Sequence, residues 1–468
     1  MVGAREVNLS PNILEVNERT HDGSVAQAFG LWVGRWLCII AMVFASGDVW
    51  PVLKLGFTFR LAQFVIILAT LIVMLMPRVR LRVIPGLKWM FGFVLWIIFT
   101  LPLSLLFQRS VAYVVWTISD FLIVATFVQY FGEPRKAEVL VRWYAVSFIA
   151  ISTFGLLQLV LGLMGHSLLI RQWWIEGVLP RINGISYEPS YYSTYLIAGW
   201  VFALRLLEGN VPVPSRRVQW LCAGSTTVAL LICGSRMGWL MMLLWGGFRG
   251  FVKIAGPLSR GCVKRRWLGR LPLLILMSGL SSAAVLHYAR VETAELEKVS
   301  FLLRGLDLVG DSGRSSKPRE DELLWTLDAF AEHPLVGTGI GALPVDIAPH
   351  EGAAVHTVRQ AKEHEGMSIL PEIFASTGLV GGGLMLGLTA AVVRKYKLAT
   401  TGAFTWQREL MRAVAWGLIW MLFTLQMNQN FLRIYIYVDL AVLLSCCVAY
   451  SDAAVDARSP KSLAFAKT

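Results

Sequence analysis

Two arginines stand in short segments rich in glycine, serine and proline, where the chain is expected to turn sharply. Arg181 opens the segment 181–190 (RINGISYEPS), and Arg236 closes the turn Gly234–Arg236. A guanidinium group keeps its charge at physiological pH and presents a planar set of donors that matches phosphate oxygens. The two segments therefore predict binding of a phosphate or diphosphate group. The alternative is that each arginine reaches toward ordinary lipid headgroups.

Three further residues could complete such a site. Glu188 precedes Pro189, so it could cap a helix or pair with Arg181. Tyr187 belongs to an aromatic-rich stretch, which suits a membrane interface or the face of a sugar ring. Arg433 follows a run of amide side chains at 426–430 and adds another cation. We expect these three to contact the substrate.

A base is needed if the site transfers a group to a hydroxyl. His364 lies between two acids, and an imidazole pKa of about 6.5 suits proton abstraction near neutral pH. His364 could also be an ordinary histidine of a solvated loop, and Glu365 is the second candidate for the base. Other histidines of the same segment compete with it: His333, His350 and His356. The sequence shows no zinc-type Cys/His spacing, so we expect no metal and no cofactor.

Long apolar segments must position these residues. Hydrophobic residues make up 56% of the chain and charged residues 16%, and the mean hydropathy is +0.60. Apolar runs of about 17–25 residues, the length that crosses a bilayer, recur along the sequence. We predict an all-α polytopic membrane protein with about twelve transmembrane helices. They lie near 28–46, 58–76, 88–107, 110–130, 143–165, 190–207, 218–234, 237–252, 271–287, 367–393, 408–427 and 434–450. The two spans around Gly234–Arg236 could instead form one broken element.

The distribution of lysine and arginine predicts the orientation. The loops after even-numbered spans hold 21 of these residues, and the short loops on the opposite side hold seven. Positive loops stay in the cytoplasm, so we expect an inner-membrane protein with both termini cytoplasmic. The same bias explains the net charge of +13, so nucleic acid is not an expected partner. The six cysteines lie in spans or on the cytoplasmic side, and no disulfides are expected.

This orientation divides the chain into five parts. A cytoplasmic tail (1–27) precedes spans one to nine (28–287), which include a periplasmic loop at 166–189. A periplasmic loop domain (288–366) separates spans nine and ten and contains an expected amphipathic helix at 320–333. Spans ten to twelve (367–450) and a cytoplasmic tail (451–468) complete the chain. The candidate residues thereby fall on one membrane face.

Four motifs in this order resemble the O-antigen polymerase and O-antigen ligase superfamily of bacterial polysaccharide assembly. They are Arg181…Gly184…Glu188-Pro189-Ser190, Gly234-Ser235-Arg236, the His333–Gly341 string and the Thr377–Gly381 segment. The resemblance covers about residues 145–450 and includes the twelve-span layout. One position departs from the family pattern: the usual histidine falls at Met367, and His364 is the nearest. The family's base is therefore replaced here by His364 or by Glu365.

The resemblance implies a metal-independent, inverting glycosyltransferase of the periplasmic leaflet. Its donor would be an undecaprenyl-diphosphate-linked glycan, with His364, Glu365 and Arg236 as catalytic residues. Arg181, Glu188, Tyr187 and Arg433 would bind the lipid diphosphate and the glycan. The expected partners are this donor, a glycan or lipid A-core acceptor, membrane lipid and a chain-length regulator protein.

Alternatives remain within and outside this family. The segment 181–190 favours a polymerase of O-antigen or exopolysaccharide repeats over an O-antigen ligase that acts on lipid A-core. A secondary transporter, such as a flippase of lipid-linked glycans, is the alternative of a different class. Such transporters usually show symmetry between their halves, whereas the large insert here is asymmetric.

Overall fold

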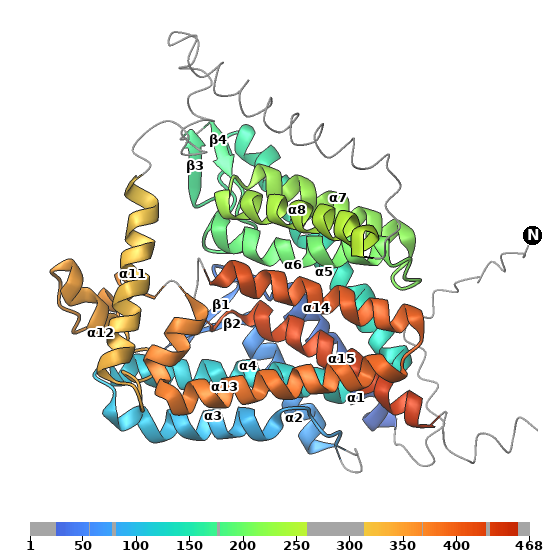
Figure 1. Cartoon of the computed structure of the whole chain (residues 1–468), viewed down its shortest axis with the longest axis horizontal. Helices are drawn as coiled ribbons and strands as arrows, with labels where there is room; N and C mark the ends of the chain where they lie inside the picture. The colour runs from blue at the N-terminus through green and yellow to red at the C-terminus, as the bar shows by residue number, and fades with distance from the viewer. Residues whose placement is uncertain are drawn as a thin grey trace, which may run out of the picture.

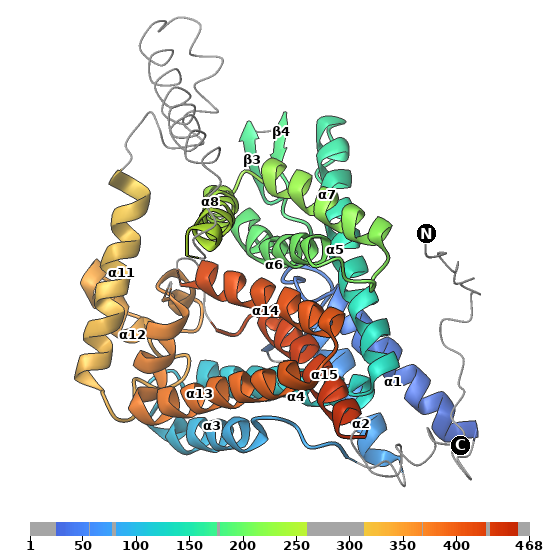
Figure 2. The same cartoon turned by 45° about the vertical axis from the view of Figure 1, so that its right-hand side comes forward.

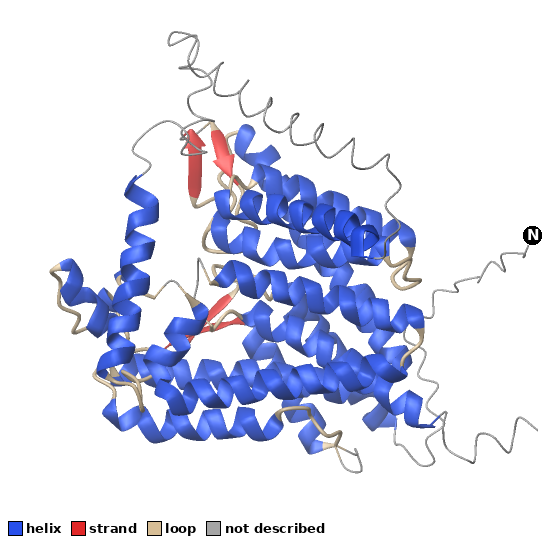
Figure 3. Cartoon of the chain, in the orientation of Figure 1, coloured by secondary structure: helices blue, strands red, loops and turns tan. Residues whose placement is uncertain are grey.

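The computed structural model describes residues 25–55, 57–76, 81–175, 178–259, 313–366, 368–426 and 431–456. These residues form a helical bundle with two short antiparallel hairpins, β1–β2 and β3–β4 (Figures 1 and 3). The hairpin strands are β1 (Val52–Leu55), β2 (Phe57–Arg60), β3 (Gln172–Ile175) and β4 (Leu179–Arg181). The predicted helical fold class is thus confirmed for the part of the chain that is described.

Eleven of the predicted spans coincide with long helices. These are α1 (Val25–Val43), α2 (Leu61–Leu75), α3 (Leu87–Thr100), α4 (Phe107–Phe131), α5 (Pro134–Leu163), α6 (Pro189–Glu208), α7 (Arg216–Ile232), α8 (Arg236–Ser259), α13 (Ile369–Gly402), α14 (Thr405–Leu425) and α15 (Ile434–Asp456). The predicted span 271–287 lies outside the described residues. The segments around Gly234–Arg236 form two helices joined by a turn.

Four of the described helices are long and apolar enough to cross a membrane. They are Phe107–Phe131, Pro134–Leu163, Ile369–Gly402 and Ile434–Ser451. Three shorter helices, Gln27–Val43, Leu61–Leu75 and Leu87–Leu103, are also apolar. These helices indicate a membrane protein, and the number of twelve spans stays a prediction.

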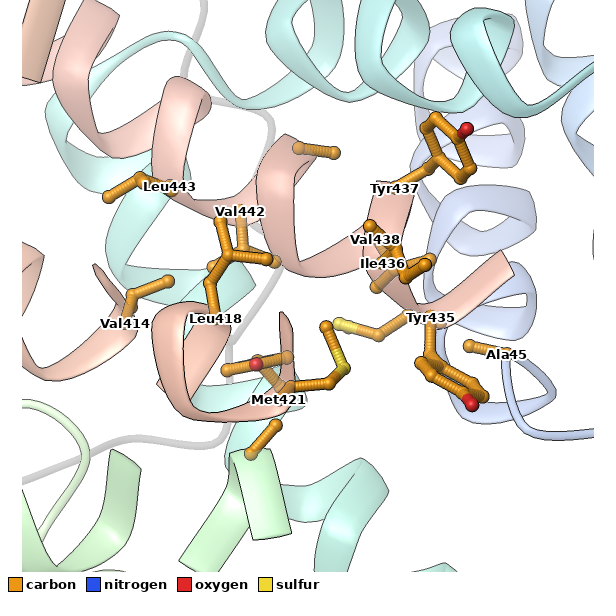
Figure 4. Packing of buried hydrophobic residues seen from close by; sticks show 14 of the residues in the cluster. Ala45, Val414, Leu418, Met421, Tyr435, Ile436, Tyr437, Val438, Val442 and Leu443 are labelled. Carbon is orange, nitrogen blue, oxygen red and sulfur yellow. The ribbon is translucent and has the colours of Figure 1, made fainter. Parts of the chain in front are cut away.

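Helix α15 occupies the centre of the bundle. Its side chains are buried on every side, which is the pattern of a helix surrounded by other helices. Figure 4 shows Leu418 and Met421 of α14 packed beside Val438 and Val442 of α15. The core therefore fixes α14 and α15 against each other and, through α15, against α4.

Consecutive helices alternate in direction, so the loops gather at the two ends of the bundle. One end joins Arg82 to Glu133 and Arg249 to Glu208 through ion pairs. The opposite end, called the site end below, brings together the loops that contain Asp48, Arg181 and Glu365, as detailed in the next section. The predicted site residues thus share one end of the fold.

Helix α11 and several short helical turns cover the site end. They are α11 (Gly313–Glu332), α12 (Pro344–Ile347) and the 3-10 turns Ala348–Glu351 and Gln360–Glu363. Figures 1 and 2 both show α11 lying across the direction of the long helices. Helix α11 contains the expected amphipathic helix 320–333 up to Glu332, but the preceding residues 288–312 lie outside the described part of the chain.

Helix α13 is broken at Gly378, where the glycine-rich string after His333 docks into the gap. Gly378 has a φ of 65°, in the left-handed region that favours glycine. The Thr338 N–H donates to the Ala375 carbonyl (2.9 Å), and the Leu379 N–H donates to the Pro334 carbonyl (2.8 Å). The string thus supplies the hydrogen bonds that an unbroken helix would have made itself, which buried irregular backbone requires.

Candidate functional site

Arg181 connects the first two sequence motifs. It ends β4, and its Nη1 donates to Oε1 of Gln172 on β3 (2.8 Å). Its Nη2 donates to the carbonyl oxygen of Gly234 (3.1 Å), which belongs to the turn before α8. Burial lowers the pKa of the Arg181 guanidinium, and the nearby charge of Arg236 acts in the same direction. The group still stays protonated near neutral pH, because arginine starts above 12.

Arg236 begins α8 and is exposed. The residue before it holds the turn in place: Ser193 of α6 donates from its hydroxyl to Oγ of Ser235 (2.8 Å), and the Gly238 N–H donates to the same oxygen (3.4 Å). Ser235 therefore caps α8 and ties its first turn to α6. Two guanidinium groups are held within electrostatic range of each other, an arrangement that favours an anion between or beside them.

Glu188 and Tyr187 follow Arg181 in the segment 181–190, but their side chains make different contacts. Glu188 precedes α6, makes no capping bond with its side chain, and accepts a hydrogen bond from the Ser190 hydroxyl (3.1 Å). Its charge lies within electrostatic range of Arg181, which favours the pairing alternative over helix capping. Tyr187 is 53% exposed, and the Arg171 guanidinium lies 5.7 Å from its ring centroid. Tyr187 thus presents a ring at the surface.

Arg433 lies in a closed cluster of charges. It is 7% exposed, its Nη1 lies 3.1 Å from Oδ2 of Asp48, and its Cζ lies 3.8 Å from the ring centroid of Tyr191. Arg60 binds the other oxygen of Asp48 (2.9 Å). Burial lowers the pKa of Arg433, but the surrounding acidic groups, Asp48 first among them, together outweigh this effect, so the pKa lies above its usual value. In this structure Arg433 therefore fastens two loops and is covered from solvent.

Glu365 belongs to a second ion pair at the same end. Arg109, at the start of α4, is 5% exposed and lies 2.8 Å from Oε1 of Glu365 through Nη2. The same guanidinium donates to the hydroxyl of Tyr113 (2.8 Å) and to the carbonyl of Ala361 (2.8 Å). Arg109 thereby holds the segment before α13 against α4, with the Glu365 side chain partly accessible.

His364 faces another direction from Glu365. Its Nδ1 lies 2.5 Å from Oε2 of Glu351, on the 3-10 turn after α12. On the same turn, the ring of His350 stacks on Trp325 of α11, with 5.4 Å between centroids. A carboxylate that orients an imidazole is a known arrangement for a base. Of the two candidate bases, however, Glu365 is the one that contacts an arginine of the site end.

The ring of Tyr191 links the ion pairs into one array. It lies within electrostatic range of Arg433, Glu188, Glu365 and Asp48. We call this set the charge array. Its members are Asp48, Arg60, Arg109, Arg181, Glu188, Tyr191, Arg236, Glu365, Glu372 and Arg433. Such an array can hold a polyanion at its arginines and a proton at its carboxylates. Within the described residues, no three His, Cys, Asp or Glu side chains are grouped so that they could hold a metal ion.

Several members of the array were not predicted as site residues. They are Asp48, Arg60, Arg109, Tyr191 and Glu372, and their role depends on contacts between segments far apart in sequence. Asp120 of α4 accepts a hydrogen bond from the side-chain amide of Gln63 (3.4 Å) and lies outside the charge array. In the amide run, the Leu370 N–H donates to Gln426 (3.3 Å), and residues 427–430 lie outside the described chain.

The sequence was compared with protein-family models and with curated proteins, and neither comparison finds a match. The resemblance to the O-antigen polymerase and ligase superfamily therefore rests on the four motifs alone.

Proposed function

We propose that this chain is a membrane glycosyltransferase that uses a lipid-diphosphate-linked glycan, most readily undecaprenyl diphosphate, at the periplasmic face of the bacterial inner membrane. The observation that carries the proposal is the contact of Arg181 with Gly234. It places two arginines from distant motifs beside each other at one end of an apolar bundle. A diphosphate at headgroup level, with its hydrocarbon tail in the bilayer, has the charge that such a pair binds best.

The chemistry follows from the array. The acceptor hydroxyl attacks the anomeric carbon of the donor from the side opposite the diphosphate, so the configuration inverts. The bond between that carbon and the diphosphate oxygen breaks, and the electron pair leaves with the diphosphate. Arg181 and Arg236 stabilise the growing negative charge, and Glu365 accepts the proton of the hydroxyl. In this scheme the guanidinium groups supply the positive charge that a metal ion supplies in other transferases.

The acceptor decides between the two members of the proposed class. A polymerase adds the growing chain to a second lipid-linked repeat, and a ligase adds it to lipid A-core. We favour the polymerase, because the segment 181–190 is more typical of polymerases. Purified protein in proteoliposomes is given the lipid-linked repeat alone or together with lipid A-core. Longer chains with the repeat alone support a polymerase, and product only with lipid A-core supports a ligase.

The same experiment tests the class. A transporter moves the lipid-linked glycan across the vesicle membrane and leaves its length unchanged. Transfer of the glycan to a new hydroxyl, with release of lipid diphosphate, is the result that the proposal requires. Translocation without such release would contradict it.

A further inference from the structure

Glu372 is a buried carboxyl group of the charge array with an unused oxygen. It lies in the first turn of α13 and is 5% exposed. Its Oε2 has no hydrogen-bond partner among the described residues. A buried polar oxygen without a donor destabilises the fold, and ionisable groups in membrane helices are usually functional for that reason. Because Glu372 also lies within electrostatic range of Glu365, Arg109 and Arg433, its role belongs to the charge array.

Glu372 lies close to the segment that carries Glu365. Gly366, the next residue after Glu365, packs against Glu372: a Cβ added to Gly366 would lie 3.8 Å from Cγ of Glu372. Each of the two carboxylates lies within electrostatic range of the other. The charged or titratable groups that face Glu372 are Glu365 before α13, Arg109 and Tyr113 on α4, Arg433 at the start of α15, and Tyr437 on α15.

The neighbouring carboxylates are already engaged. Glu365 is bonded to Arg109, and Asp48 is shared between Arg60 and Arg433. Hydrogen bonds from guanidinium groups make a carboxylate a weaker proton acceptor. Oε2 of Glu372 has no such donor among the described residues, so it is the better place for a proton that enters this region. Glu365 is the partly exposed group through which the proton can enter.

We propose that Glu372 is the proton store of the site and works through Glu365. The inference rests on the proposed function. When the acceptor oxygen bonds to the anomeric carbon, its O–H bond breaks and the proton passes to Glu365. Glu365 passes that proton to Oε2 of Glu372 and becomes a carboxylate again beside Arg109. After the product leaves, the proton returns to solvent by the same route. Glu372 is thus a positioning residue for the proton, because it does not touch the sugar.

The test compares four proteins in proteoliposomes with an undecaprenyl-diphosphate-linked glycan as donor: wild type, Glu372→Gln, Glu372→Asp and Asp439→Asn. Asp439 is the matched control, because it is 1% exposed, its Oδ2 also lacks a hydrogen-bond partner, and it lies outside the charge array. We expect Glu372→Gln to lower kcat about 10²-fold, within the range for loss of acid–base assistance, with KM for the donor unchanged. Glu372→Asp should recover part of the rate, and Asp439→Asn should stay within about twofold of wild type.

The pH profile separates proton storage from a structural role. A proton acceptor must be ionised, so the wild-type kcat should rise with pH along an acid limb, and this limb should move to lower pH in Glu372→Gln, where only Glu365 accepts the proton. A Glu372→Gln protein with wild-type kcat and an intact acid limb would overturn the inference. So would equal losses in Glu372→Gln, Glu372→Asp and Asp439→Asn, since these would show general damage to a buried site.

An infrared titration keeps the inference testable if no glycan is transferred. Protonation of a carboxylate on acidification produces a carboxylic-acid carbonyl band. We expect the wild-type protein to show a titrating band that is absent from Glu372→Gln and present in Asp439→Asn. Absence of transfer by wild type would refute the proposed function alone. Superimposable titrations of wild type and Glu372→Gln would refute the proton store alone.

Discussion

The break in α13 offers a quantitative prediction through Gly378→Ala. A Cβ at this position would lie 2.2 Å from the carbonyl oxygen of Leu335, and the φ of 65° is unfavourable for alanine. With a ψ of −171°, this backbone conformation is essentially limited to glycine and costs another residue about 1–3 kcal/mol. The clash also displaces the docked string, whose backbone hydrogen bonds to α13 contribute about 1 kcal/mol each. The substitution weakens the three hydrogen bonds donated by Thr338, Gly339 and Leu379. We therefore expect the free energy of unfolding to fall by about 3–5 kcal/mol.

The measurement is thermal unfolding of purified protein in detergent, with Gly383→Ala as the control. Gly383 lies in the same helix, and an added Cβ would meet no atom within 4 Å. Alanine is favoured over glycine in a helix by about 1 kcal/mol, so the control should keep or slightly raise the Tm. Gly378→Ala should lower the Tm by several degrees. Equal unfolding temperatures for the two variants would refute the interpretation that the glycine-rich string after His333 and the broken helix α13 interlock.

Four further predictions concern the site and the topology. Arg236→Lys keeps the charge but loses the planar fork, so its activity should be impaired, and Arg236→Ala should lose about 10²–10³ in rate. Polysaccharide chain lengths on gels report the activity. Wild-type chain lengths from an Arg181→Ala, Arg236→Ala double variant would mean that these arginines only contact lipid. Glu365→Gln should reduce turnover more than His364→Ala, and the reverse order would return the base to the histidine. Activity of the purified protein should persist in EDTA, and complete loss that magnesium restores would contradict an arginine-based mechanism. A cysteine placed at Ser315 should react with a membrane-impermeant reagent from the periplasm; reaction only after permeabilisation of the inner membrane would reverse the orientation.

The helices could be predicted because their signal is local. Apolar runs and charged loops marked eleven segments that the structure describes as long helices, and the ninth predicted span lies outside the described residues. Composition alone does not give the number of helices that cross the membrane, because helices such as α6 carry polar groups near their ends. The turn at Gly234–Arg236 could be predicted because glycine and serine are typical of turns.

The charge array was only partly predictable, because its chemistry depends on pairing between distant segments. Arg181 and Arg236 stand in recognisable turns, and the structure brings these turns together. Arg433 was predicted to bind substrate. Its partner Asp48 lies 385 positions away in the sequence, so no local pattern shows that the two side chains form an ion pair. Glu372 resembles any polar residue in a first helical turn until its neighbours are known.

The interlock between the glycine-rich string and α13 has a consequence for recombination between related sequences. The string at 334–339 and the helix around Gly378 make a single backbone network. An exchange that replaces the string but keeps the original helix α13 would leave backbone hydrogen-bonding groups of both segments without partners. These two segments should therefore be inherited together, and grafts of this region should take their borders before His333 and after Gly381.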